Sequence, residues 1–88
     1  MYLHIGASVV IPEQDVLGIF DLDNTTSSRI TRNFLAQVQQ AGQVIPVGED
    51  LPKSFLLCRD KGGKVKVYLS QLSTATLLKR MELGSLTI

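Results

Sequence analysis

Residues 54–70, SFLLCRDKGGKVKVYLS, are the stretch that decides the fold. The apolar run at its start and the alternating run KVKVYLS over 64–70 predict two strands, because successive side chains of a strand point to opposite faces of a sheet. The alternation places Val65, Val67 and Leu69 on a core face. The other face, which we expect to be solvent-exposed and basic, holds Lys64, Lys66, Tyr68 and Ser70. Between the strands, residues 60–63 (DKGG) predict a tight turn, since glycine readily adopts positive φ. The stretch therefore predicts a β-hairpin.

Shorter strands and two helices are expected around this hairpin. Apolar runs predict strands over 2–5, 9–11 and 16–20, a helix over 28–40 and a short extended piece over 44–47. Ser73 is the predicted N-cap of a second helix that runs through residue 81, and residues 83–88 are expected to be a loose or docking tail. The apolar residues expected to face the core are Ile30, Phe34, Leu35 and Val38 on the first helix and Leu77, Leu78 and Met81 on the second. We expect one α+β domain over residues 1–88, a mostly antiparallel small sheet with two helices.

Length and composition agree with one small globular domain. The chain has 88 residues, of which 44% are hydrophobic and 19% charged, and its net charge is +1. No apolar run is long enough to span a membrane, and no secretory signal opens the chain, so we expect a cytoplasmic protein. The single cysteine cannot form an internal disulfide, and with one histidine it cannot build a zinc site. We therefore expect neither a metal nor a cofactor.

Charge is distributed unevenly along the chain. Residues 1–28 carry four acids and no base, whereas residues 61–88 carry five bases and one acid. Such asymmetry is typical of a chain with an anionic partner, or of copies that associate through unlike faces, although a merely solvated surface also fits. The candidate nucleic-acid-binding residues are Arg29, Arg32, Lys53, Lys64, Lys66, Lys79 and Arg80.

The run Asp21-Leu22-Asp23-Asn24-Thr25 resembles the first motif of haloacid dehalogenase phosphatases, in which two aspartates act as nucleophile and acid/base. That chemistry also needs a lysine and a second acidic pair on a doubly wound parallel sheet, which 88 residues cannot hold. We therefore expect Asp21 to end a strand and residues 23–28 to connect it to the helix. We expect no catalytic residue and no enzyme.

Five strings distributed over residues 1–82 resemble one family in their order and spacing. That family is the RemA/RemB family of small extracellular matrix regulators of spore-forming Gram-positive bacteria, and the similarity is greatest to its RemB-type branch. The strings are Met1-Tyr2-x-His4-x-Gly6, Asp15-Val16-x-Gly18-Ile19-Phe20-Asp21, Phe34-Leu35, Pro52-Lys53-Ser54 and Val67-Tyr68-x-Ser70-x-Leu72-Ser73-x-x-Thr76-Leu77-x-Lys79-Arg80.

The resemblance implies a transcription regulator of biofilm matrix genes with a LytTR-like fold. Its subunits would form a cyclic homo-oligomer whose basic rim contacts double-stranded DNA, with no small-molecule substrate and no membrane contact. One departure concerns the arginine pair that DNA-binding relatives carry just before the strand at Ser54. Here the matching positions hold Asp50 and Leu51, whereas Lys53 matches a base of the relatives. A homo-oligomeric protein-interaction module without DNA binding is therefore the alternative.

Overall fold

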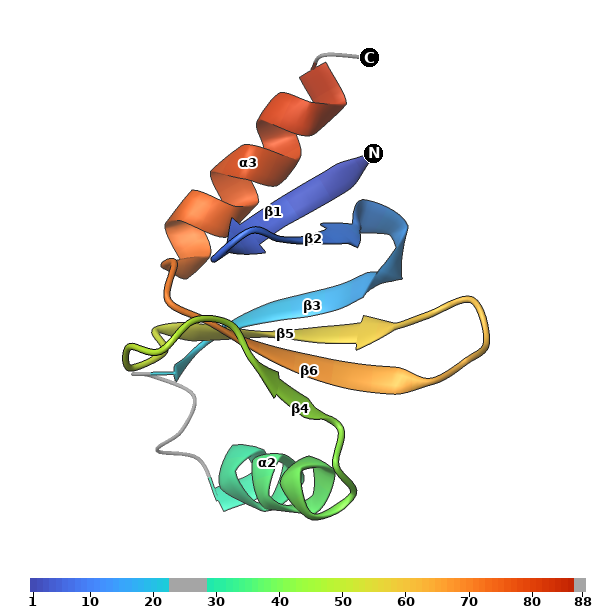
Figure 1. Cartoon of the computed structure of the whole chain (residues 1–88), viewed down its shortest axis with the longest axis vertical. Helices are drawn as coiled ribbons and strands as arrows, with labels where there is room; N and C mark the ends of the chain where they lie inside the picture. Colours follow the sequence, from blue (N-terminus) through green and yellow to red (C-terminus); the bar gives the residue numbers. More distant parts are fainter. Residues whose placement is uncertain (23–28, 87–88) are drawn as a thin grey trace.

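The computed structural model describes residues 1–22 and 29–86 of the chain. Its elements form an α+β fold, as the sequence predicts (Figure 1). In chain order they are β1 (Tyr2–Gly6), β2 (Val9–Pro12), the 3-10 turn η1 (Glu13–Asp15), β3 (Val16–Asp21), α2 (Arg29–Gln40), β4 (Val44–Pro46), β5 (Ser54–Arg59), β6 (Val65–Ser70) and α3 (Thr74–Leu86).

A four-stranded sheet with the order β3-β5-β6-β4 forms the middle of the molecule. The predicted hairpin is its centre, because β5 and β6 are antiparallel and pair Ser54 with Ser70 and Arg59 with Val65. β3 joins β5 in the antiparallel sense, and the short β4 joins β6 in the parallel sense. The sheet is therefore mostly antiparallel, with one parallel edge strand.

β1 and β2 form a separate two-stranded antiparallel sheet. Leu3 faces Ile11 across this pair, and both side chains are buried. The turn between the strands is short: Ala7 and Ser8 have φ values of 45° and 66°. Two positive φ values in a two-residue connection match the twist of the flanking strands, but they are costly for residues other than glycine or asparagine.

Both faces of the four-stranded sheet are covered (Figure 1). On one face, a core cluster joins Leu56 and Cys58 of β5 to residues of β1, β2 and α3. On the other face, Phe55 and Val67 pack against Val38 of α2. The sheet is therefore the middle layer of three, with α2 on one side and the β1–β2 hairpin with α3 on the other.

The expectation that one face of β6 is wet and basic holds for Lys64 and Lys66 but is wrong for Tyr68 and Ser70. Tyr68 packs against the cluster that includes β1 and α3, and Ser70 is completely buried. Burial of Ser70 is possible because its hydroxyl is satisfied: Oγ donates to the carbonyl oxygen of Ile5 at 2.8 Å and accepts the N–H of Leu72 at 3.1 Å. The alternation of residues 64–70 assigned the side chains of β6 to the correct two faces. However, β1 and α3 cover the part of the second face that holds Tyr68 and Ser70.

The two helices lie where the sequence predicts them, with three differences. On α2, Phe34, Leu35 and Val38 face the sheet as expected, but Ile30 is 81% exposed. It borders an open groove beside β3 and takes no part in the filled core.

α3 begins after Ser73, whose Oγ accepts the N–H of Thr76 at 3.2 Å, which confirms the predicted N-cap. Leu77 is buried and Met81 packs beside it, whereas Leu78 is 51% exposed because it lies about 100° further round the helix. The helix continues to Leu86, so the predicted tail is helical over 83–86.

Candidate nucleic-acid interface

Four basic residues gather at the free end of the β5–β6 hairpin. Arg59 ends β5, Lys61 lies in the turn, and Lys64 and Lys66 stand at the start of β6. The first three are exposed, and the side chain of Lys66 is 37% exposed. We call residues 59–66 the hairpin tip. With one acid, Asp60, against four bases, its formal charge is +3.

Asp60 builds the turn of the hairpin tip. Its Oδ1 accepts the backbone N–H of Lys64 at 2.9 Å, and its backbone N–H and C=O bond to Lys64 and Gly63 at 3.0 and 2.9 Å. Its other carboxylate oxygen lies 3.9 Å from the ammonium of Lys66, within ion-pair distance. Among the described residues this is the only ion pair, so Arg59, Lys61 and Lys64 keep their charge unpaired there.

Arg59 lies along the turn of the hairpin tip. A Cβ atom on Gly63, whose φ is +81°, would sit only 3.7 Å from the Nη2 atom of Arg59. The guanidinium therefore lies beside Gly63 of the turn. Gly62 and Gly63 carry no side chains of their own, and the nearest side-chain atoms at these two positions belong to Asp60 and Arg59.

The other predicted site residues lie on separate layers. Arg29 and Arg32 are exposed on α2, whereas Lys79 and Arg80 are exposed on α3, and the two helices lie on opposite sides of the sheet (Figure 1). Lys53 is exposed just before β5, at the opposite end of that strand from the hairpin tip. The seven predicted bases are thus exposed or half-exposed, but the single chain does not bring them into one stripe.

Arg80 also has a structural contact. Its Nη1 donates to the backbone oxygen of His4 at 2.9 Å and lies 3.4 Å from the Nδ1 atom of the same residue. This bond fastens α3 to β1. Part of the donor capacity of Arg80 is therefore already used inside the chain.

Sequence reasoning did not single out Arg59 and Lys61. The signal that could have found them is the turn itself, because both residues lie within four positions of Gly63, as does Lys64. Counting charge around a predicted turn, rather than along predicted strands and helices, would have identified the whole hairpin tip.

The loop before β5 has no basic pair. Asp50 and Leu51, the two positions where the family resemblance implies an arginine pair, are both exposed, Leu51 to 89%. When the amide oxygen of Gln71 faces this loop, it accepts the backbone N–H groups of Glu49 and Asp50 at 3.0 and 2.8 Å. The loop thus presents two acids and an apolar side chain, Glu49, Asp50 and Leu51.

Cys58 and Asp21, two residue types that can serve in catalysis, lie in the core and at the end of a strand. Cys58 is buried in the core, and burial, with a further contribution from Asp15, raises the pKa of its thiol from 9.0 to about 11. Asp21 ends β3, an antiparallel edge strand, as predicted. The connection expected over 23–28 lies outside the described residues. Among residues 1–22 and 29–86, no three potential metal-ligating side chains gather, and no helix is long and apolar enough to cross a membrane.

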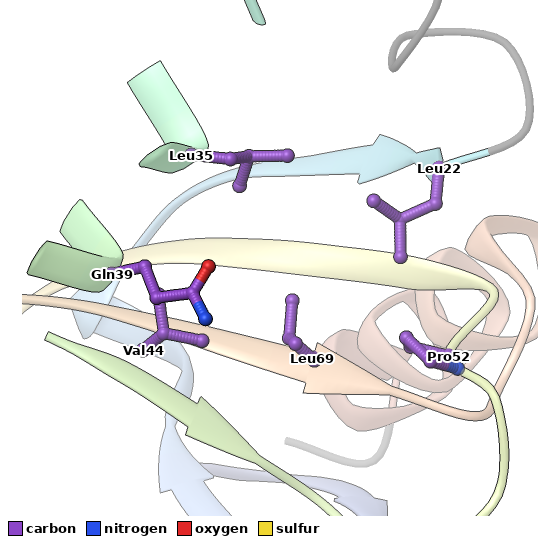
Figure 2. A pocket seen from close by; sticks show the side chains of 6 residues that line it. All are labelled: Leu22, Leu35, Gln39, Val44, Pro52 and Leu69. Carbon is purple, nitrogen blue, oxygen red and sulfur yellow. The ribbon is translucent and has the colours of Figure 1, made fainter. Parts of the chain in front are cut away.

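Two apolar hollows flank α2. Figure 2 shows the first, of about 170 Å³, in which Leu22, Leu35 and Leu69 converge beside Val44 and Pro52, with the amide of Gln39 at its rim. The second, of about 270 Å³, lies between α2 and the edge strand β3, where Ile30 and Phe34 meet Phe20 and Leu57. Among the described residues, no charged side chain lines either hollow, and the polar side chains there are Gln39 in the first and Thr31 in the second.

Two comparisons with known proteins cover nearly the whole fold. A family model described as extracellular matrix regulatory protein A-like matches residues 2–81, from the first residue of β1 into α3. Extracellular matrix regulatory protein B of Bacillus subtilis (strain 168) is 34% identical over 82 residues, which cover 93% of this chain and 91% of that protein.

Proposed function

This chain belongs to the extracellular matrix regulatory protein A-like family, and from that premise we propose that it is a DNA-binding transcriptional regulator of matrix genes. It contacts the phosphate backbone of duplex DNA through lysine and arginine side chains, as a cyclic homo-oligomer of LytTR-like subunits. It acts without catalysis and without a small-molecule substrate. The family assignment also confirms the similarity to the RemB-type branch that the sequence strings predict.

The observation that carries DNA binding is the exposure of the basic side chains. Six of the seven predicted residues are exposed, and Lys66 is half-exposed. Lysine and arginine contacts to phosphates position a protein on DNA without reading bases, and each contact releases counterions, so such binding weakens as salt rises. One subunit offers few contacts. A ring of subunits multiplies them through avidity.

Features of the surface support self-association. β3 and β4 lie at the edges of the four-stranded sheet, where a further strand can pair. Large apolar side chains are exposed on β1, β2 and β3, at Tyr2, Val10 and Leu17. Unlike surfaces that meet head to tail close into a ring when the rotation between subunits allows it.

Fluorescence anisotropy of labelled duplex DNA across a salt series tests the proposal. We expect binding at low salt, similar affinity for unrelated sequences, and a steady loss of affinity as salt rises. Absence of binding at low salt, or an affinity that does not change with salt, would contradict it.

A second candidate function is a homo-oligomeric protein-interaction module that does not bind DNA. The observation that favours it is the loop before β5, where Asp50 and the exposed Leu51 replace the arginine pair of DNA-binding relatives. A pull-down from nuclease-treated lysate separates the two functions. A protein partner that survives nuclease treatment, together with no affinity for duplex DNA, would favour this candidate.

A further inference from the structure

We propose that the hairpin tip, residues 59–66, is the surface of this chain that lies against the phosphates of duplex DNA. The inference rests on the proposed function and names the part of the molecule that performs it. It assigns contacts to Arg59 and Lys61 in addition to Lys64 and Lys66. It also gives the bases of α2 and α3 at most a secondary part.

The hairpin tip projects from the sheet. β3 pairs with β5 only as far as Cys58, and β4 pairs with β6 only from Val67 onward. The segment between these two positions, which is the Arg59–Val65 pair and the turn that joins it, therefore has no neighbouring strand on either side among the described residues, and it extends beyond the ends of β3 and β4 (Figure 1). A two-stranded ribbon is narrow enough to approach the backbone at a groove of B-DNA.

Positive charge is denser along the hairpin tip than along α2. Eight residues carry four bases and one acid, while α2 carries two bases over twelve residues. Asp60 neutralises Lys66 in part, but its main bonds hold the turn in shape. Arg59, Lys61 and Lys64 thus remain available on a pre-formed turn, which lowers the entropy lost on binding.

The chemistry of the tip favours DNA over an acidic protein. Protein interfaces depend on a few large buried anchors, most often aromatic or arginine side chains packed into pockets. The turn of the tip holds only charged residues and two glycines, and both described hollows lie beside α2. Exposed cations on a turn without apolar side chains suit a phosphate surface, which needs charge but no apolar pocket.

The test compares two variants of the full chain with the same change in net charge. Lys61→Gln with Lys64→Gln removes two charges from the tip. Asn33→Asp with Gln37→Glu adds two negative charges to the exposed face of α2, near Arg29 and Arg32, and alters no base. All four positions are exposed, so both proteins should fold, which thermal melts by circular dichroism verify.

Affinity for a labelled duplex is measured at several salt concentrations. We expect the tip variant to bind at least about tenfold more weakly at low salt and to lose about one unit of salt slope for each lysine removed. The α2 variant should stay within about threefold of the original protein, because its added charges lie away from the contact. Lys61→Arg with Lys64→Arg keeps the charge and should restore binding.

The outcomes separate this inference from the function on which it rests. If the unaltered protein does not bind duplex DNA, the proposed function itself fails. If the unaltered protein binds and the α2 variant loses as much affinity as the tip variant, or more, DNA binding stands but the hairpin tip is not its site. A tip variant that binds like the unaltered protein overturns the inference in the same way.

Discussion

At the scale of single residues, two buried serines connect the layers. Ser54 and Ser70 face each other across β5 and β6, and both are fully buried. Ser54 Oγ donates to the carbonyl oxygen of Leu72 at 2.7 Å, which holds the start of the connection to α3. Ser70 bonds to Ile5 of β1 and to the N–H of Leu72. Three hydrogen bonds of two small hydroxyls thus join the central sheet to β1 and to the segment before α3.

Ser70→Ala removes a hydroxyl that satisfies two backbone groups. We expect it to lower the free energy of unfolding by about 2 kcal/mol, because the carbonyl of Ile5 and the N–H of Leu72 lose a partner where water is excluded. Urea unfolding at a fixed protein concentration measures the loss. Ser73→Ala, which removes only the exposed N-cap, is the comparison and should cost about 1 kcal/mol. A Ser70→Ala protein as stable as the original would show that these bonds do not matter.

The thiol of Cys58 predicts a pH dependence of stability. Its pKa rises from 9.0 to about 11 in the folded chain, so its contribution to stability is fully present below pH 9 and is lost as pH rises toward 11. The comparison is with Cys58→Val, which keeps an apolar side chain of similar size and removes only the thiol. The difference in unfolding free energy between the two proteins should shrink or reverse in favour of Cys58→Val above pH 9. A constant difference would contradict the assignment.

At the scale of elements, the β1–β2 turn is built from unsuited residues. Ala7 and Ser8 both adopt positive φ, at 45° and 66°, which asparagine and glycine adopt more readily. We expect Ala7→Asn with Ser8→Gly to raise the free energy of unfolding by about 1 kcal/mol, measured by urea unfolding. Ser8→Thr, a β-branched residue at the same φ, should lower it. A double variant that is no more stable would mean that the turn relaxes at little cost.

Much of the fold could be predicted because its elements have clear periods. Alternation over 64–70 identified β6, and Ser73 identified the start of α3. The elements that cover each face of β6 could not be predicted, since alternation divides the side chains of a strand between two faces without showing what packs on them. Tyr68 and Ser70 were therefore assigned to solvent, although β1 and α3 cover them. The parallel pairing of β4 depends likewise on packing between distant segments.

The candidate site was predicted in part. The sequence pointed to exposed bases, and the structure places Lys64 and Lys66 together on the hairpin tip. The sequence could not show that Arg29 and Lys79 lie on opposite sides of the sheet, because that separation follows from how the helices pack on it. Spacing along the chain relates residues within an element. It does not relate residues on elements that meet only in the folded state.

At the scale of the whole molecule, the prediction concerns the number of chains that assemble in solution. We expect light scattering to give an integral multiple of 9.6 kDa that does not change over the micromolar range, because a closed ring has no free contact surfaces left. A stable mass near 9.6 kDa would contradict the ring. A mass that keeps growing with concentration would indicate open edge-to-edge pairing at β3 or β4 instead.

The central claim is that several subunits together hold the phosphates of duplex DNA. Its most direct test is the slope of log affinity against log salt for the unaltered protein on a duplex of unrelated sequence. One hairpin tip offers four bases, which limits its slope to about −3.6 at roughly −0.9 per phosphate. We predict a linear dependence with a slope steeper than this limit, because neighbouring subunits add their own contacts. A slope near zero, or no binding at low salt, would contradict the account.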